Sequence, residues 1–186
     1  MDSVLADLGP SLVSFHNAKY GTHLALEDHL DFDLTKIWKC PEDEVIRRIH
    51  EFYETTYFDK IVPVVGSQDG VAYLKSKYDL HLITSRPNHI EKKSLEWLYT
   101  YFPDSFKIIH HTNQMAKKGS VYKTKGQVCK ENDVTIMIED ALHNVEDCVH
   151  VGVKVLLFTQ PWNKAKKNLH SNIKRVNDWK DIRNYL

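Results

Sequence analysis

Cysteine, glycine and proline are all scarce in this chain of 186 residues, which contains three, seven and six of them, respectively. Three cysteines without a Cys-x-x-Cys pair indicate neither a disulfide framework nor a zinc site, so we expect a reducing compartment. The low glycine and proline content excludes collagen-like and linker-dominated chains. A hydrophobic share of 42% excludes a disordered chain, and the length suits one compact domain with a small insert.

The chain also lacks net charge and long apolar runs. Its 25 basic and 25 acidic side chains cancel, which argues against a nucleic-acid partner bound by bulk electrostatics. No apolar run approaches the roughly 20 residues of a membrane span. The first residues include Asp2 and Asp7 and no basic cluster, unlike a signal peptide. We therefore expect a cytoplasmic protein without a membrane partner.

Two kinds of periodicity divide the chain. Helical spacing of apolar residues predicts helices at 10–20 and 41–53, with residues 22–40 irregular between them. Further along, short apolar strands alternate with helices, with strands predicted at 80–84, 106–110, 134–138 and 153–158 and a short ordered segment at 173–176. This alternation predicts a three-layer α/β fold with a parallel sheet. We expect residues 10–65 to form a helical cap and residues 1–9 and 66–186 to form the core domain.

Polar residues gather where the predicted strands end. Thr84, Ser85 and Arg86 follow one strand, and Glu139 and Asp140 end another. Ligands of open α/β sheets bind beyond the carboxyl ends of the strands. Adjacent acids there suit Mg²⁺, and hydroxyls with an arginine at a helix start suit a phosphate.

Each of these residues also has a purely structural explanation. Thr84 and Ser85 can cap a helix, Lys125 can be a surface lysine, and Glu139-Asp140 can cap the helix that follows. Aromatic side chains between residues 10 and 65 could stack on a base, or form the core of the cap. Only the order of the polar residues along the chain favours a common site.

The order of these polar residues along the chain resembles the order of the sequence motifs in phosphatases of the haloacid dehalogenase superfamily. Met1-Asp-Ser-Val-Leu-Ala-Asp7 is similar to the tail of its first motif, Asp-x-Asp-x-(Thr/Val), in the form typical of the 5'(3')-deoxyribonucleotidase-like branch. Thr84-Ser85 resembles the second motif, Lys125 the third, and Glu139-Asp140 the fourth. Lys123 and Lys130 lie nearby, so the choice of the third-motif lysine stays open.

The resemblance implies a Mg²⁺-dependent phosphomonoesterase acting on a nucleotide or similar small phosphate. It implies that Asp2 is the general acid and base and also a metal ligand through its backbone carbonyl. Thr84, Ser85 and Lys125 would hold the phosphate, with Arg86 beside them. Glu139 and Asp140 would hold the metal.

One part of the first motif is absent from the printed sequence. The residue before Met1 would be the nucleophilic aspartate, and the strand leading to it would lie between the strands that end at Thr84 and Glu139. Without it, those neighbours would stand roughly 9.6 Å apart, twice the usual spacing. Unpaired buried backbone groups would then cost about 1–3 kcal/mol each. The sequence therefore predicts that hydrolysis is lost or severely reduced.

Three explanations remain open from the sequence alone. The first is that the chain derives from a longer one that begins with the strand and the aspartate, with Met1 as a false start. The second is that the neighbouring strands close up, or that another segment or chain fills the gap. The third is a degenerate phosphatase, and the alternative of another class is a non-catalytic protein whose sheet is completed by self-association as a homodimer.

Overall fold

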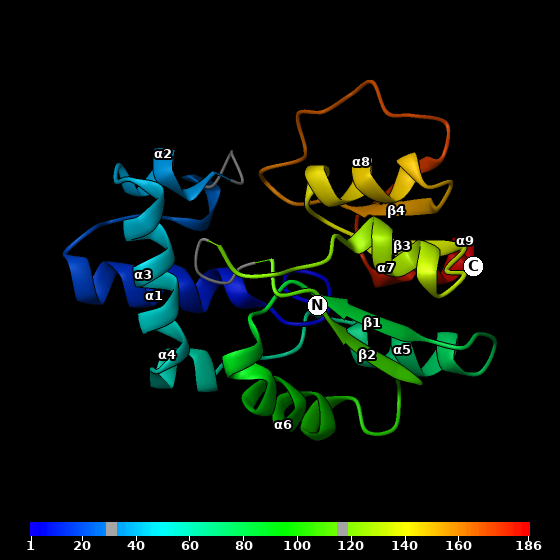
Figure 1. The fold of residues 1–186 in the computed structure, drawn as a ribbon, viewed down its shortest axis with the longest axis horizontal. Coiled ribbons are helices and arrows are strands. Elements are labelled where there is room, and N and C mark those ends of the chain that lie inside the picture. The colour runs from blue at the N-terminus through cyan, green and yellow to red at the C-terminus, as the bar shows by residue number, and fades with distance from the viewer. Residues whose placement is uncertain (29–32, 115–118) are drawn as a thin grey trace.

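The computed structural model describes residues 1–28, 33–114 and 119–186. It has an α/β fold in which parallel strands are covered by helices, as the alternation of segments predicted (Figure 1). Strands β1 (His81–Thr84) and β2 (Ile108–His111) form one parallel pair. Strands β3 (Ile136–Glu139), β4 (Lys154–Phe158) and β5 (Ile173–Val176) form a second, three-stranded parallel sheet.

Helices connect most consecutive strands, because parallel neighbours need a crossover; the connection 159–172 between β4 and β5 contains no helix. The crossover segments are η2 (Asn88–Ile90) with α6 (Glu91–Tyr101), then α7 (Lys125–Glu131) and α8 (Leu142–His150). Helices α5 (Ser67–Lys75) and α9 (Trp179–Tyr185) lie at the two ends of this part of the chain. Thr124 and Gln127 form a capping box at the start of α7, which places Lys125 in its first turn.

A separate group of helices stands beside the sheets (Figure 1). It contains α1 (Leu8–Tyr20), η1 (Leu26–Asp28), α2 (Leu34–Trp38), α3 (Glu42–Tyr53) and α4 (Thr56–Asp59). Phe15, Phe52 and Ile61 lie at the centre of its apolar core. Helix α2 falls in the segment that we predicted to be irregular, so that prediction is wrong there. Five residues are too few to show a helical period.

The two sheets are not joined to each other. Among the described residues, no strand pairs with the edge of β1 or β3 that faces the other sheet. A cavity of about 540 Å³ lies between these edges. The two neighbouring strands therefore do not close up, which was one of the alternatives left open by the sequence, and no described segment completes the sheet.

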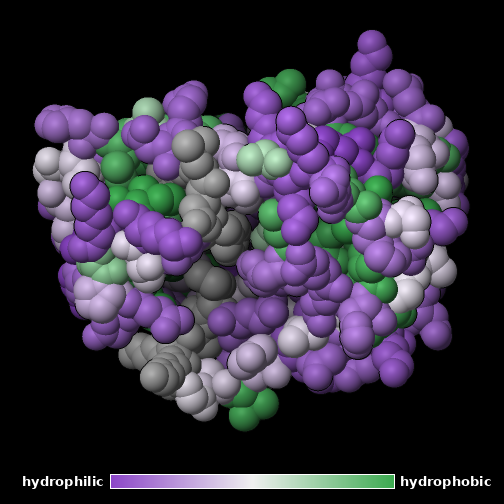
Figure 2. Space-filling model, turned by 90° about the horizontal axis from the view of Figure 1, so that it is seen from above, coloured by the Kyte–Doolittle hydropathy of each residue, from purple (hydrophilic) through white to green (hydrophobic). Residues whose placement is uncertain are grey.

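The face of the molecule shown in Figure 2 is mainly hydrophilic, with small hydrophobic areas on both the helical and the sheet side. The chain termini bound the cavity, since Met1 and Leu186 both line it. None of the described helices has the length and apolar character needed to cross a membrane.

Candidate functional site

A buried ion pair lies at the carboxyl end of β3. The Nζ atom of Lys125 lies 2.6 Å from Oε2 of Glu139, and the two side chains are only 6% and 2% exposed. Oε1 of Glu139 accepts hydrogen bonds from the backbone of Ala141 and from the side-chain amide of Asn144. Burial alone would raise the pKa of Glu139, but the charge of Lys125 and the side-chain hydrogen bonds from Lys125 and Asn144 lower it. Glu139 is thus held as a carboxylate.

Asp140 is buried next to Glu139 and has a different environment. Burial raises the pKa of its carboxyl well above the usual value, and the charge of Glu139 raises it further. The side-chain amide of Asn163 donates to the backbone carbonyl of Asp140, which fixes the main chain here. A buried carboxyl of this kind is costly to ionise unless a nearby positive charge offsets the loss of water.

Asp2 lies on the same side of the molecule, held by Arg86. The guanidinium donates from Nη2 to Oδ1 of Asp2 at 2.6 Å and from Nε to Oδ2 at 3.1 Å. Arg86 is 2% exposed and also donates to Ser94, and its guanidinium lies over the ring of Phe58. Burial would raise the pKa of Asp2, but the charge and hydrogen bonds of Arg86 lower it below the usual value. This favours an ionised Asp2, suited to accepting a proton.

Thr84 is the last residue of β1, and Ser85 follows it. Thr84 is buried, and its Oγ1 accepts a hydrogen bond from the backbone of Arg86. Ser85 is partly exposed and donates to the side-chain oxygen of Gln114. Arg86 makes its contacts with protein groups, so its role in binding phosphate stays a prediction. The same holds for the roles of Thr84 and Ser85.

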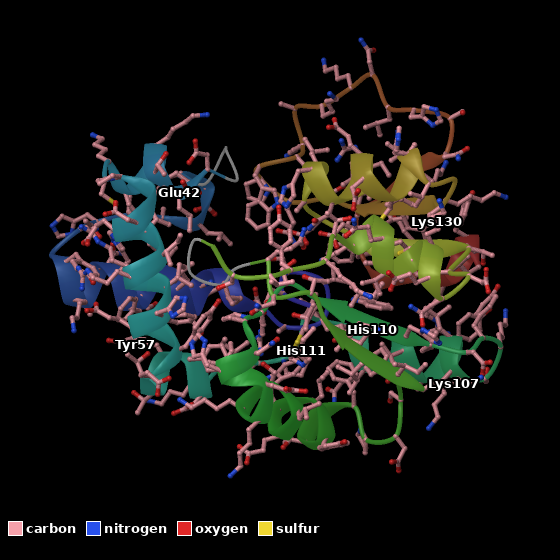
Figure 3. The ribbon with its side chains drawn as sticks, in the orientation of Figure 1. Glu42, Tyr57, Lys107, His110, His111 and Lys130 are labelled. Atoms are coloured by element: carbon pink, nitrogen blue, oxygen red, sulfur yellow. The ribbon has the colours of Figure 1, made fainter. Side chains whose placement is uncertain are left out.

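The lysines near the third motif differ in their surroundings. Lys125 is the one paired with Glu139, whereas Lys123 pairs with Glu131 on the surface at 58% and 52% exposure. Lys130 is exposed on α7, and Figure 3 shows it away from the strand ends. These placements favour Lys125 over its two neighbours, a choice that the sequence left open.

The donors present fit Mg²⁺ in one respect. Mg²⁺ is usually held by one or two carboxylates, together with water and substrate phosphate, and Asp140 offers a buried carboxyl next to an ionised one. Within the described ranges, however, no three His, Cys, Asp or Glu side chains converge as a metal cluster. Asp2 and Glu139 are each paired with a cation instead. Metal binding at Asp2, Glu139 and Asp140 therefore stays a prediction.

Sequence reasoning missed three groups that shape the site. Asn144 and Asn163 position the acidic strand end, and Tyr53 is buried close enough to Asp2 for its pKa to be raised by burial and by the charge of Asp2. Asn144 lies in the segment 138–144 at the end of the acidic strand, and Asn163 lies in the segment 161–163 after the next strand. Their positions close to strand ends are the sequence signal that could have indicated a place in the site.

Comparison with known proteins identifies relatives along the whole chain. The sequence profile of the family described as 5' nucleotidase, deoxy (pyrimidine), cytosolic type C protein (NT5C) matches residues 1–186. The chain is 28% identical over 191 residues to the 5'(3')-deoxyribonucleotidase of Bacillus subtilis (strain 168), and the match covers 100% of this chain and 95% of the relative. A 5'(3')-deoxyribonucleotidase of Bacillus phage SPbeta matches with the same identity and coverage.

Solved structures share the fold. A HAD-superfamily hydrolase of Geobacter sulfurreducens has a TM-score of 0.62 at 14% identity, covering 100% of this chain and 95% of that one. A HAD-type hydrolase structure of Bacillus subtilis, described as bound to magnesium, has a TM-score of 0.66 at 14% identity, with the same coverage. The chain therefore belongs to the 5' nucleotidase, deoxy (pyrimidine), cytosolic type C family, and it shares its fold with hydrolases of the haloacid dehalogenase superfamily.

Proposed function

We propose that this site is that of a Mg²⁺-dependent phosphomonoesterase that acts on a nucleotide or a similar small phosphate. The observation that carries the proposal is the grouping of a hydroxyl pair, a buried lysine and two adjacent acids at the carboxyl ends of β1 and β3. Anionic ligands of α/β folds bind at this end. The names of the curated relatives, which are deoxyribonucleotidases, favour a nucleotide substrate.

Each residue has a role that follows from phosphoryl transfer. The hydroxyls of Thr84 and Ser85 and the ammonium of Lys125 would bind the phosphoryl oxygens and offset their charge. The metal would be held by the carboxylates of Asp140 and Glu139 and by the backbone carbonyl of Asp2. When bound, Mg²⁺ would add a second positive charge at the phosphoryl group. Lys125 also donates to Glu139 and keeps it ionised, so the same lysine contacts both the proposed phosphate site and the proposed metal site.

Hydrolysis needs one more carboxylate than the described residues place there. In a covalent mechanism, a carboxylate oxygen attacks phosphorus and the ester oxygen leaves with a proton from Asp2, which must first take that proton up from solvent because Arg86 holds it ionised in the free site. Water then attacks the phosphorus, gives a proton to Asp2, and releases phosphate and the free carboxylate. Asp2 is fixed on Arg86 and cannot serve as both nucleophile and proton carrier. We therefore propose that the printed chain hydrolyses phosphate esters weakly or not at all.

The second candidate is a non-catalytic binding protein. The open edges of β1 and β3 favour it, because such edges readily pair with another strand. A chain of this kind would keep phosphate binding and lose turnover.

The test compares the printed chain with one extended before Met1 by four apolar residues and an aspartate. Both are assayed with a chromogenic phosphate ester and with deoxynucleoside monophosphates, with Mg²⁺ and with a chelator. Matched controls carry asparagine in place of the added aspartate, or Asp140→Asn. We expect turnover only in the extended chain with Mg²⁺, and loss in both controls.

Two results would contradict the proposal. Equal turnover by the printed and the extended chain would show that the added aspartate is not the nucleophile. A folded, extended chain without turnover on any phosphate ester would favour the non-catalytic protein.

A further inference from the structure

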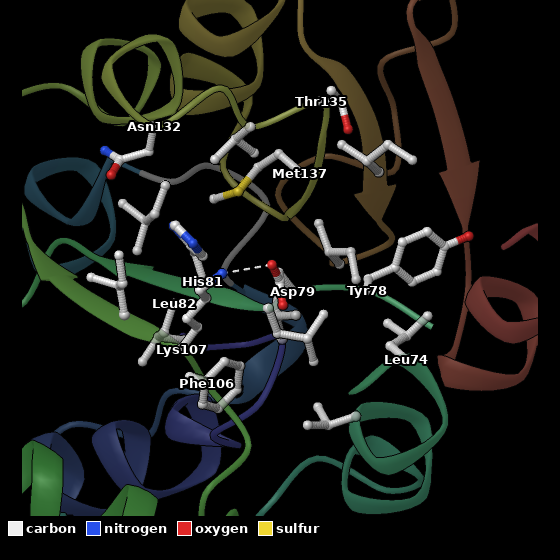
Figure 4. Close-up of a pocket in the computed structure, with 18 of the residues that line it drawn as sticks. Leu74, Tyr78, Asp79, His81, Leu82, Phe106, Lys107, Asn132, Thr135 and Met137 are labelled. Carbon is white, nitrogen blue, oxygen red and sulfur yellow. Dashed lines mark hydrogen bonds and ion pairs between the residues drawn. The ribbon is translucent and has the colours of Figure 1, made fainter. Parts of the chain in front are cut away.

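Cys129 and Cys148 face each other across the contact between α7 and α8. Their Sγ atoms lie 4.0 Å apart, and both side chains are fully buried. They lie in an apolar cluster that contains Ile83, Val145 and Leu157. Neither cysteine is among the described residues that line the cavity between β1 and β3, several of which Figure 4 shows. The cysteine pair therefore does not depend on what fills that cavity.

The backbones of the two helices come close at the level of the cysteines. A Cβ atom on Gly126 would lie 2.7 Å from the backbone oxygen of Asp147, the residue before Cys148. Figure 1 shows α7 and α8 side by side. A disulfide has an S–S bond of about 2.05 Å, so the two sulfur atoms need to approach by about 2 Å. Because the backbones are already in contact, rotation of the two side chains and a small shift of α7 provide a movement of this size.

The pair lies one helical turn from the groups that hold Glu139. Cys129 is four residues after Lys125 on α7, and Cys148 is four residues after Asn144 on α8. Residues four apart lie on the same face of a helix. Lys125 and Asn144 both donate to the Glu139 carboxylate. A bond between the two sulfur atoms would therefore join the two helices one turn away from this carboxylate.

The two thiols differ in reactivity. The hydrogen bond with Cys148 lowers the pKa of Cys129, and the charge of Lys125 acts in the same direction against the effect of burial. The hydrogen bond with Cys129 and burial both raise the pKa of Cys148. Since the thiolate is the nucleophile, Cys129 reacts first and Cys148 second.

We propose that Cys129 and Cys148 are a site of reversible oxidation, where hydrogen peroxide converts the two thiols into a disulfide that fixes α7 on α8. The Cys129 thiolate attacks one oxygen of the peroxide and the O–O bond breaks, which gives a sulfenic acid and a hydroxide ion. The hydroxide takes up the proton that the Cys129 thiol has lost and becomes water. The Cys148 sulfur then attacks the Cys129 sulfur, so that the S–S bond forms, the S–O bond breaks, and the hydroxyl leaves as water with the Cys148 proton. The two sulfur atoms together lose two electrons, and one peroxide is reduced to two water molecules.

Burial determines which oxidants reach the pair. Both sulfur atoms are shielded from solvent, so reagents reach them through local opening of α7, which has seven residues. Hydrogen peroxide needs a smaller opening than a peptide disulfide such as oxidised glutathione. The scarcity of cysteine excludes a disulfide framework, but a single pair of this kind fits the transient, redox-sensing bonds of reducing compartments.

The test exposes the reduced full chain to hydrogen peroxide, blocks the remaining thiols with iodoacetamide and maps the peptides by mass spectrometry. We expect one cross-linked peptide that joins Cys129 to Cys148, and its loss after treatment with dithiothreitol. In the oxidised protein, amide hydrogen exchange in α7 should be at least about tenfold slower than in the reduced protein, because the bond holds α7 on α8. Amides of α5, which packs against α9, should exchange at unchanged rates.

Variants separate this pair from the third cysteine. Cys148→Ala removes the second thiol and should abolish both the cross-link and the slowed exchange. Cys40→Ala, between α2 and α3, is the matched control and should retain both. Circular dichroism of each variant verifies that it is folded; if Cys148→Ala is unfolded, Cys129→Ala replaces it.

Two outcomes would overturn the proposal. One is a folded, peroxide-treated chain in which Cys129 and Cys148 are alkylated or singly oxidised and no peptide joins them. The other is a cross-link that leaves the exchange of α7 unchanged. None of these readouts involves phosphate-ester turnover, so they test the cysteine pair separately from the proposed function.

Discussion

Lys125 and Glu139 form a buried ion pair, and burial is the reason that removing one partner lowers the free energy of unfolding. Replacing Lys125 with methionine leaves a carboxylate that is 2% exposed without its cation. Breaking a buried pair from one side typically costs about 3–5 kcal/mol. We expect Lys125→Met to lower the free energy of unfolding by an amount in this range, measured by urea denaturation at neutral pH.

Lys123 and Glu131 provide the matched control. Their Nζ–Oε2 distance is also 2.6 Å, but both side chains are more than half exposed. Lys123→Met should cost about 1 kcal/mol or less. Equal losses in the two variants would contradict the role assigned to burial.

Arg86 determines the protonation of Asp2. Burial raises the pKa of Asp2 and Arg86 more than offsets this, so Arg86→Met should raise that pKa. Because the folded pKa of the native Asp2 is depressed, its stabilising contribution is present above the unfolded value of about 3.9 and is lost as the pH falls through the folded pKa. The variant should lose this acid-dependent contribution.

Carboxyl carbon chemical shifts of labelled aspartate, followed by NMR over the acidic range, measure the pKa directly. Arg47→Met, which removes an exposed arginine paired with Glu44, is the control and should leave the Asp2 titration unchanged. An Asp2 pKa that does not move in Arg86→Met would refute the assignment.

At the scale of single residues, the sequence predicted which groups stand at strand ends but not what they contact. Glu139, Asp140 and Lys125 could be located because each adjoins an apolar strand or a helix start. The pairing of Asp2 with Arg86 joins residues 84 positions apart, and nothing in local spacing reports a contact of that range. Arg86 was accordingly predicted beside the phosphate, whereas the structure shows it on Asp2.

Helices α7 and α8 meet at a glycine. A Cβ atom on Gly126 would lie 2.7 Å from the backbone oxygen and the carboxylate of Asp147, and the Gly126 N–H donates to that carboxylate. Alanine would gain up to about 1 kcal/mol of helix propensity. Overpacking typically costs about 1–3 kcal/mol, so we expect Gly126→Ala to be destabilising on balance.

Thermal denaturation measures this change. Lys130→Ala, at an exposed position of the same helix, is the control and should change the free energy of unfolding by less than about 0.5 kcal/mol. A Gly126→Ala protein more stable than the native chain would show that the two helices have room to separate.

Apolar strands and helices of several turns were predictable, and helices of about one turn were not. The helix predicted at 41–53 is α3, Glu42–Tyr53, where three acids in the first turn mark the start. The segment predicted at 173–176 is β5. Helix α2 has five residues and α4 has four, which is little more than one turn, so their helical state depends on tertiary packing that the sequence pattern does not display.

The cavity between the sheets leaves the core of the whole molecule underpacked. Leu82 lines it, and Leu82→Phe adds apolar volume where space is available. Cavity-filling substitutions commonly stabilise by about 0.5–2 kcal/mol, and we expect this effect here. Leu157 lies in the middle of the β3–β5 sheet and is fully buried, so Leu157→Phe should destabilise by about 1–3 kcal/mol.

Chemical denaturation of both variants gives the comparison. If both phenylalanines destabilise to the same degree, the space around Leu82 is not available in solution. The existence of this space could be predicted only through the resemblance to a family with a strand there, because hydrophobic patterns report single elements and not the order of strands in a sheet.

The positions of the two chain ends have a consequence for engineering. Leu186 accepts a hydrogen bond from Tyr78, just before β1 begins, while Met1 is buried where β1 and β3 finish. A linker leaving Leu186 and returning to Met1 would travel through the hollow in the same sense as both flanking strands. Such a linker, with new termini opened in an exposed loop, would give a circularly permuted chain in which the linker occupies the cavity.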